Sequence, residues 1–407
     1  MVNLLSPAGD IEKLKYAIMY GADSVYLAGE NFGMRAKAAN FTLDEINEGF
    51  IFASERGREV NVAVNIMARN NDVKPIMEYI RKLYAIGIRK LIIADPGVIF
   101  CVKNEFPDMF ITLSTQQSTT NYESLRFWHN NGISRIVLAR ELPFADIKTI
   151  CENKPSQMEV EVFVHGAMCI SYSGRCLLSN YLAGRDSNKG DCAQPCRWQY
   201  SLKEKTREGQ YFDIEENENG SFFFNSKDLC LIEHVKNLID AGVNSFKIEG
   251  RMKSIFYVST VTNAYKLAIK RATLGTEYEW EDLYEELTKV SHRKYTKAFY
   301  FGNANEDCQN YGTSSYTRNY DFIAKVLEDT NDEGITKIMQ RNKFISGDSA
   351  EFVSPTALGT EFTIKQIYDA KMNEREDAPH PAEILYIKTE GTHLKQFDLI
   401  RKVSSSK

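Results

Sequence analysis

The stretch EVEVFVH, residues 159–165, carries the alternation that decides the fold of this 407-residue chain. Side chains point alternately to the two faces of a β-strand, so Val160, Val162 and Val164 share one face. Glu161 and His165 share the opposite face. In a closed barrel of parallel strands the apolar face packs on the surrounding helices, and polar groups near the strand ends line the mouth. The stretch therefore predicts a barrel strand with Glu161 and His165 pointing inward.

The same pattern recurs along the chain. Over the first 165 residues, short apolar runs alternate with amphipathic stretches, as expected of strands alternating with helices around a parallel sheet. Glycine follows a predicted helix at Gly21, Gly87, Gly132 and Gly242, and glycine accepts the left-handed conformation that ends a helix. The predicted strands are one more than an eightfold barrel holds, so one must lie outside it. They span residues 3–5, 24–28, 60–65, 90–94, 110–114, 135–139, 159–165, 222–225 and 246–249.

The pattern divides the chain into two domains. Residues 1–302 are predicted to form a TIM-like (β/α)8 barrel with a cysteine-rich insertion at about residues 166–200. Residues 303–318 are polar and lack periodicity, so we expect a linker there. Residues 319–407 contain only short alternating runs separated by turn residues, which predicts a small C-terminal all-β barrel.

The composition excludes several classes of protein. Hydrophobic residues make up 43% and charged residues 26%, which are ordinary globular values, so global disorder and collagen-like structure are excluded. The formal net charge of -5 provides no positive field over the whole surface, so any contact with nucleic acid must be a local patch. No run of ~18 apolar residues and no secretory signal are present, and we expect a cytoplasmic protein without a membrane partner.

Four cysteines lie close together in the sequence. Cys169, Cys176, Cys192 and Cys196 span 28 residues in a stretch rich in Gly, Ser and Asn. Thiolates on such irregular backbone can converge on a metal centre. The spacing contains no C-x2-C pair of the kind typical of structural zinc sites, which favours an iron-sulfur cluster. The alternative is a set of reduced cysteines without a ligand.

A fifth cysteine, Cys230, follows at a distance. We expect it on a helix that begins near Asp228. It either packs in the core or substitutes for one of the four cluster ligands.

Charged residues near the predicted strand ends are candidates for chemistry. Glu161 and His165 either act as general acid and base or pair with each other inside the barrel. Lys247 and Arg251, near the end of the last barrel strand, either bind an anionic small molecule or form internal salt bridges. Arg35 is a further candidate for the same anion.

Two groups of basic residues are candidates for RNA contact. Arg175, Arg185 and Arg197 lie among the cysteines, and Arg293 and Lys294 precede a run of aromatic residues. Basic side chains contact phosphates, and aromatic rings stack on unpaired bases. The alternative for both groups is a solvated charged surface.

Residues 161–179, EVFVHGAMCISYSGRCLLS, also resemble the cysteine signature of peptidase family U32. The resemblance extends over essentially the whole chain. Its other motifs are LLSPAGD (4–10), RAKAANF (35–41), LSTQ (113–116), CAQPCRW (192–198), NSKDL (225–229) and KIEGRMKS (247–254).

The resemblance implies both a cofactor and an activity. Besides an early collagenase-like assignment, the family includes oxygen-independent hydroxylases of the tRNA wobble uridine, of a ribosomal RNA cytidine and of a ubiquinone precursor. It implies a 4Fe-4S cluster on Cys169, Cys176, Cys192 and Cys196, prephenate as co-substrate, and contact with the anticodon region of tRNA. We therefore expect C5-hydroxylation of the wobble uridine.

Two other functions remain open. One is a collagenase-like peptidase, although neither a G-x-S-x-G elbow nor an H-E-x-x-H helix is present. The other is a non-catalytic iron-sulfur subunit that works with a second U32-family chain.

Overall fold

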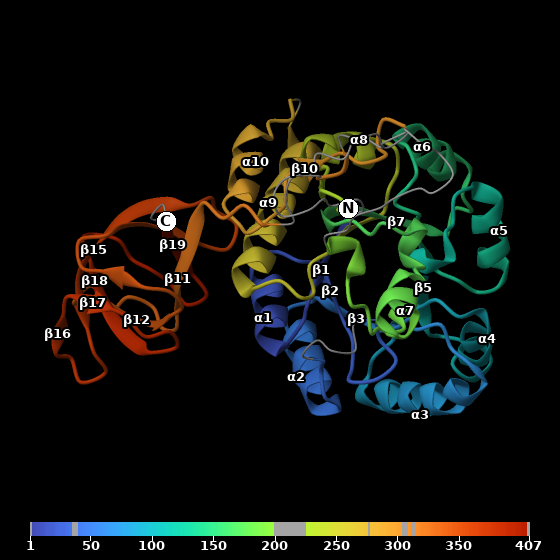
Figure 1. Ribbon diagram of the computed structural model, residues 1–407, viewed down its shortest axis with the longest axis horizontal. Coiled ribbons are helices and arrows are strands. Elements are labelled where there is room, and N and C mark those ends of the chain that lie inside the picture. The colour runs from blue at the N-terminus through green and yellow to red at the C-terminus, as the bar shows by residue number, and fades with distance from the viewer. Residues whose placement is uncertain are drawn as a thin grey trace, which may run out of the picture.

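The protein consists of a helix-surrounded barrel and a smaller β domain beside it, which Figure 1 shows in blue to orange and in orange to red. The computed structural model describes residues 2–34, 40–198, 225–275, 277–302, 308–310 and 315–404. No helix in these ranges is both long and apolar enough to cross a membrane.

Eight parallel strands close the larger barrel. Each strand from β1 to β7 pairs with the next, and β9 closes the ring because it pairs with both β7 and β1. The (β/α)8 prediction is thereby confirmed. The strands are β1 (Asn3–Pro7), β2 (Ser24–Leu27), β3 (Glu59–Val64), β4 (Lys90–Ile93), β5 (Phe110–Leu113), β6 (Arg135–Val137), β7 (Glu159–Ala167) and β9 (Ser245–Ile248).

Helices follow the strands in sequence and cover the outside of the barrel (Figure 1). The glycines predicted to end them have left-handed backbone, with φ of 101° at Gly21, 111° at Gly87, 80° at Gly132 and 88° at Gly242. The helices are α1 (Ile11–Met19), α2 (Leu43–Ser54), α3 (Asn70–Ile86), α4 (Pro96–Glu105), α5 (Tyr122–Asn130), α6 (Phe144–Asn153), α8 (Val235–Asp240) and α9 (Ile255–Leu274), with α10 (Glu281–Thr288) packed on α9.

The described ring of eight strands closes without the ninth predicted strand, residues 222–225. Residues 222–224 lie outside the described residues, and Asn225 is not in a strand. The two extra strands near the barrel are β8 (Asp228–Cys230), which runs antiparallel to the end of β7, and β10 (Tyr295–Thr296), which pairs with β8. β8 can pair with the end of β7 because β7 has 9 residues and extends beyond its shorter neighbours.

The C-terminal domain is a closed antiparallel barrel, as predicted. Six strands pair in the ring β14-β19-β11-β12-β18-β15, and β15 pairs back with β14. Ile323, Ile338 and Ile364 are fully buried in its core. Its strands are β11 (Tyr320–Val326), β12 (Ile335–Gln340), β14 (Ser349–Val353), β15 (Thr360–Tyr368), β18 (Ile384–Thr389) and β19 (Leu399–Val403), with short strands β13 (Phe344–Ile345), β16 (Glu374–Arg375) and β17 (Asp377–Ala378).

Candidate active site at the barrel mouth

A cavity of about 150 Å³ opens at the carboxyl ends of the barrel strands. Its walls include Tyr26 of β2, Ala63 of β3, Ile92 of β4 and Lys247 of β9, each from the second half of its strand, and Phe163 from the middle of β7. Barrels of this architecture place their active sites at this end. We call this cavity the mouth cavity.

The charged lining of the mouth cavity is mainly positive. Among the residues that the structure describes around it, Arg140, Lys247 and Arg251 are cationic and Glu249 is anionic. Lys247 and Arg251 are both buried. A concave site with this balance of charge favours an anionic ligand.

Lys247 is held by an ion network in the barrel interior. Its Nζ lies 3.1 Å from Oε1 of Glu161, whose Oε2 lies 3.2 Å from Arg135 Nη1 and accepts a hydrogen bond of 2.9 Å from Ser245. Burial alone would raise the pKa of Glu161, but Lys247 and Arg135 hold it below its usual value. Glu161 is therefore an ionised positioning group for Lys247.

His165 does not share a face with Glu161, so that expectation was wrong. Between Phe163 and His165 the pairing of β7 with β9 shifts by one residue, because these two residues pair with the consecutive residues Lys247 and Ile248. Such a bulge inverts the alternation of side chains beyond it. The side chains of Glu161 and His165 consequently have different partners.

Three tyrosine rings surround the His165 imidazole. Its ring centroid lies 5.9 Å from that of Tyr257, 5.5 Å from that of Tyr265 and 5.3 Å from that of Tyr295, and its Nδ1 lies 3.4 Å from Tyr265 Oη. Burial lowers the pKa of His165 to about 3, with smaller contributions from His292 and Lys253. The imidazole is therefore neutral and stands apart from the mouth cavity.

Directly after His165, β7 approaches the end of β9 very closely. Gly166 has φ of 111°, and a Cβ at this position would lie 2.3 Å from the backbone oxygen of Glu249. Only glycine accommodates both the left-handed backbone and this contact. The chain thus leaves the barrel rim beside Glu249, one of the residues that line the mouth cavity.

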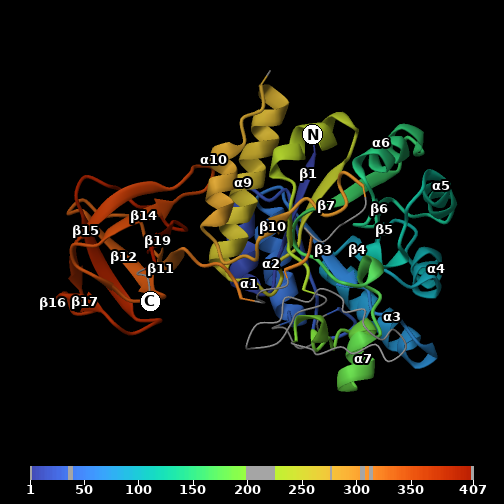
Figure 2. The same cartoon turned by 45° about the horizontal axis from the view of Figure 1, so that its top comes forward.

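Residues 168–198, which we call the cysteine segment, lie against the barrel mouth. Glu141, after β6, accepts hydrogen bonds of 2.7 and 2.9 Å from the backbone and side chain of Ser173. Arg197 donates hydrogen bonds to the carbonyl oxygens of Met168 and Ser226, at 2.8 and 2.7 Å. The segment contains the short helix α7 (Leu178–Ala183), which projects from the body of the barrel in Figure 2.

The other three clustered cysteines affect the pKa of Cys196. Burial raises the pKa of Cys196 to about 11, Arg197 opposes this rise, and the thiols of Cys169, Cys192 and Cys176 add to it. Such an effect on Cys196 requires that the other three thiols lie in its neighbourhood. The three other cysteines that the sequence singled out therefore lie within range of the charge of Cys196.

Two of the four thiols accept hydrogen bonds from the backbone. Within the described ranges, no three His, Cys, Asp or Glu side chains are arranged to hold one metal ion. Backbone N–H groups of Leu178 and Gln194 donate to the sulfurs of Cys176 and Cys192, each at 3.3 Å, and such donors are typical of iron-sulfur sites.

Sequence comparison assigns the chain to a family. The family model described as Peptidase family U32 matches residues 9–310, and the model of the Peptidase family U32 C-terminal domain matches residues 318–401. The chain belongs to peptidase family U32. This agrees with the resemblance carried by its cysteine signature.

Relatives in the U32 family carry different names. The tRNA hydroxylation protein P1 of Bacillus subtilis (strain 168) is 40% identical, over 95% of this chain and 91% of that protein. The tRNA hydroxylation protein P of Escherichia coli (strain K12) is 33% identical, over 92% and 91%. A protein named collagenase from Porphyromonas gingivalis is 32% identical, over 87% and 86%.

Cys230 lies in a strand of this U32 chain, so the predicted helix is wrong. It ends β8, where it pairs with His165 across the antiparallel ladder, and its buried thiol lies 3.9 Å from Tyr265 Oη. The projecting end of β7 supplies a pairing partner that local sequence does not reveal. Cys230 therefore packs in the barrel wall beside α9.

The predicted RNA-binding residues differ in accessibility. Arg175 and Lys294 are exposed. Arg185 lies 2.8 Å from Asp191, and the guanidinium of Arg197 donates hydrogen bonds within the protein. Arg293 is buried and lies 3.2 Å from Asp228, so it is a structural residue. Arg35 lies outside the described residues.

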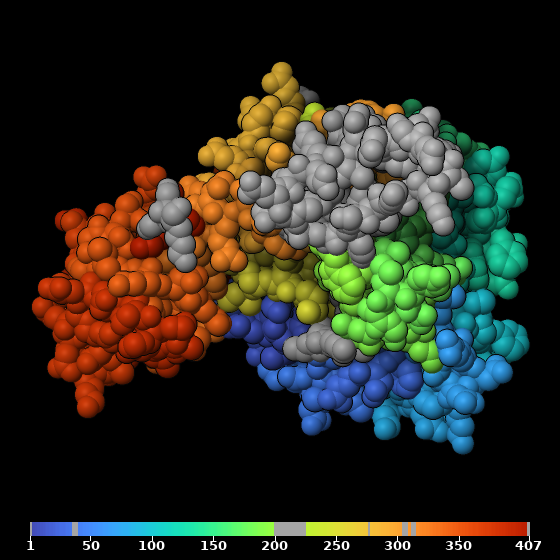
Figure 3. Space-filling view, viewed as in Figure 1, coloured from blue at the N-terminus to red at the C-terminus, as the bar shows by residue number. Residues whose placement is uncertain are grey.

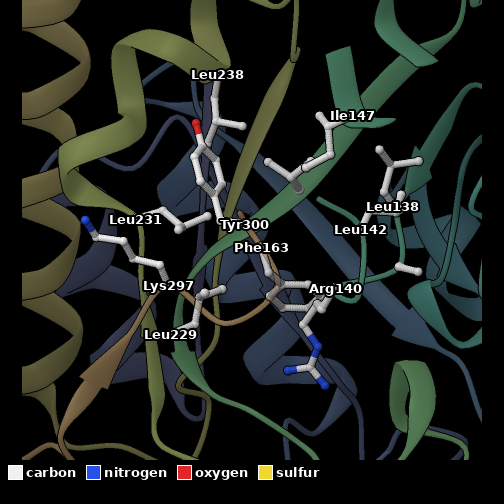
Figure 4. A pocket seen from close by; sticks show the side chains of 12 residues that line it. Leu138, Arg140, Leu142, Ile147, Phe163, Leu229, Leu231, Leu238, Lys297 and Tyr300 are labelled. Carbon is white, nitrogen blue, oxygen red and sulfur yellow. The ribbon is translucent and has the colours of Figure 1, made fainter. Parts of the chain in front are cut away.

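Arg140 is a site residue that our sequence prediction missed. Its Nη1 donates a hydrogen bond of 3.0 Å to the carbonyl oxygen of Ala167, and it lines the mouth cavity. A second pocket of only about 20 Å³ lies behind it, and Figure 4 shows the Arg140 guanidinium pointing away from the leucines of that pocket. Arg140 directly follows the predicted strand 135–139, and this position at a strand's carboxyl end is the sequence feature that could have identified it.

Proposed function

We propose that this U32 chain acts in the oxygen-independent hydroxylation of the tRNA wobble uridine at carbon 5. The observation that carries the proposal is the cationic mouth cavity whose wall includes Ser173 and Gly174, which lie between Cys169 and Cys176 in the cysteine segment. This arrangement gives a substrate and a redox group a common site. Two relatives named as tRNA hydroxylation proteins, aligned over more than 90% of this chain, support the choice of substrate.

We further propose that Cys169, Cys176, Cys192 and Cys196 hold a 4Fe-4S cluster. When bound, such a cluster supplies one-electron chemistry. The chain's own contribution is to stabilise thiolate charge, since backbone N–H groups point at two of the sulfurs and Arg197 adjoins Cys196.

Prephenate, proposed as the co-substrate, is a dicarboxylate that suits the cations of the mouth cavity. Lys247 is oriented by Glu161, and Arg251 is anchored by a hydrogen bond to the carbonyl oxygen of Met34. Arg140 lines the cavity near the cysteine segment. Charge-assisted hydrogen bonds from these side chains would fix the orientation of the carboxylates.

Amide groups in the same cavity suit a uracil base. Gln116 Oε1 accepts hydrogen bonds of 2.9 Å from Asn65 and Ser114, while its buried Nε2 has no partner among the described residues. A buried donor without a partner is costly, so it favours a ligand acceptor. We propose that Gln116 donates to a carbonyl oxygen of a uridine turned out of its stack.

The proposal is tested on tRNA from a strain that lacks this gene and carries either the wild-type chain, Cys176→Ser or Gln116→Met. Nucleosides derived from 5-hydroxyuridine are measured by mass spectrometry. They should return with the wild type and remain absent with Cys176→Ser. An unchanged nucleoside profile in the deletion strain, with no redundant pathway present, would reject the tRNA assignment.

Two assays on the purified chain separate the alternatives. A serine or cysteine peptidase of the triad type requires a nucleophile beside a histidine, whereas the partner of His165 is Tyr265. Collagen cleavage by the purified chain that survives the loss of iron would support the peptidase. The non-catalytic subunit is excluded if the iron-loaded chain alone restores the modification to isolated tRNA.

A further inference from the structure

The cysteine segment exposes large apolar and aromatic side chains beside the barrel mouth. Tyr181 is 89% exposed, Leu177 74% and Tyr172 52%. Exposed apolar groups gathered in one short segment mark an interaction surface. The segment lies on the face seen in Figure 3, where it is green. The aromatic patch consists of Ile170, Tyr172, Leu177, Tyr181, Leu182 and Trp198.

The charge of the cysteine segment indicates what this patch binds. The segment has an excess of two positive charges, although the whole chain has a net charge of -5. Asp186 and Asp191 already face Arg69 and Arg185, at 3.5 and 2.8 Å, and Lys189 faces Asp72 at 2.8 Å, whereas Arg175 is exposed. Its charged residues are Arg175, Arg185, Lys189 and Arg197 against Asp186 and Asp191.

Aromatic rings combined with positive charge are the features that bind single-stranded nucleic acid, because rings stack on bases and cations contact phosphates. A docked protein would be favoured by an apolar patch without excess charge. The position of the patch agrees with RNA. Tyr172 directly precedes Ser173 and Gly174, which line the mouth cavity.

We propose that Tyr172 and Tyr181 form a stacking platform for the unpaired bases next to the base inserted in the mouth cavity, with Arg175 on the intervening phosphates. This inference rests on the proposed function only in taking RNA as the substrate. Tyr172, Tyr181 and Arg175 would hold the RNA without touching the reacting atoms.

The test measures binding rather than chemistry. Full-length chain, purified anaerobically, is titrated into a fluorescently labelled synthetic anticodon stem-loop with uridine at the wobble position. Tyr172→Ala and Tyr181→Ala should each weaken binding about 5-fold to 100-fold, the range expected for one lost stacking contact. Tyr172→Phe and Tyr181→Phe should bind like the wild type, because phenylalanine keeps the ring face.

Two further variants separate stacking from charge. Phe100→Ala removes a ring that is 68% exposed on α4, away from the segment, and should leave the affinity unchanged. Arg175→Gln should reduce the slope of log affinity against log salt by about 0.7, whereas the tyrosine variants keep the wild-type slope. Thermal unfolding midpoints equal to that of the wild type confirm that each variant is folded.

The platform is overturned if both alanine variants bind the stem-loop like the wild type. Loss of tRNA modification in cells with normal binding of the stem-loop would also overturn it and assign the patch to a protein partner. If binding depends on the tyrosines while the deletion strain keeps its 5-hydroxyuridine, the proposed reaction fails and the RNA platform stands.

Discussion

Lys247 Nζ lies 3.1 Å from Glu161 Oε1 inside the barrel, where both side chains are buried. Lys247 also lines the mouth cavity, so the carboxylate orients a cation that faces the ligand site. The glutamate of the U32 cysteine signature is therefore part of the support beneath the site, whereas the cysteines of the signature lie beside its mouth.

Replacing Glu161 tests this support. Glu161→Gln leaves Lys247 and Arg135 without their shared carboxylate, so we expect a loss of about 3–5 kcal/mol in the free energy of unfolding. The measurement is denaturant unfolding at neutral pH. Glu328→Gln is the control, because its pair with Lys337 is solvent-exposed and should contribute little to the free energy of unfolding. Similar losses in both variants would contradict the buried network.

Arg140 should contribute to prephenate binding. Loss of a charge-assisted hydrogen bond costs about 1.5–3 kcal/mol, so Arg140→Met should raise the dissociation constant for prephenate about 10-fold to 100-fold. Isothermal titration calorimetry on the full chain measures this change. Arg126→Met, on the exposed face of α5, is the matched control. An unchanged dissociation constant in Arg140→Met would remove Arg140 from the anion site.

The cysteine assignment predicts which thiols retain iron. Serine at any of Cys169, Cys176, Cys192 or Cys196 should abolish the broad absorbance near ~400 nm that is expected of an iron-sulfur cluster. Cys230→Ser should keep it, because Cys230 lies in β8 beside Tyr265. Iron content after anaerobic purification provides a second measure. If Cys230→Ser loses iron and the serine variant of one of the other four cysteines keeps it, Cys230 replaces that cysteine as a cluster ligand.

His165 should make stability depend on pH. Its pKa in the folded chain is lowered from 6.5 to about 3, so between about pH 3 and 6.5 the unfolded chain binds this proton and the folded chain does not. The contribution is constant above pH 6.5, and stability falls toward pH 3 with a slope of up to ~1.4 kcal/mol per pH unit. His165→Phe should remove this slope between pH 6 and 4, whereas His393→Gln, at an exposed site, should keep it. A wild-type slope in His165→Phe would show that other groups cause it.

Local patterns predicted the barrel well. The three valines of β7 are buried, and the four glycines that were expected to end helices have left-handed backbone. These features depend on residues close together in sequence, which is why periodicity and turn chemistry reveal them. The same applies to the cysteines, because their concentration in one segment is itself a sequence property.

The failures arose where distant strands meet. His165 points away from the expected face because the pairing of β7 with β9 contains a bulge, and Cys230 lies in a strand because the end of β7 pairs with it. Arg293 was expected at the surface but is buried against Asp228. Each outcome depends on a partner far away in the sequence.

The sequence by itself determined the order of strands and helices, the two-domain pattern and the four cysteines, since each follows from periodicity or spacing within a few tens of residues. Only the tertiary structure decided that eight of the nine predicted strands close the ring, that Glu161 holds Lys247, and that Arg140 joins the mouth cavity. Strand register and burial set these relationships, and both are established only when distant parts of the chain pack together.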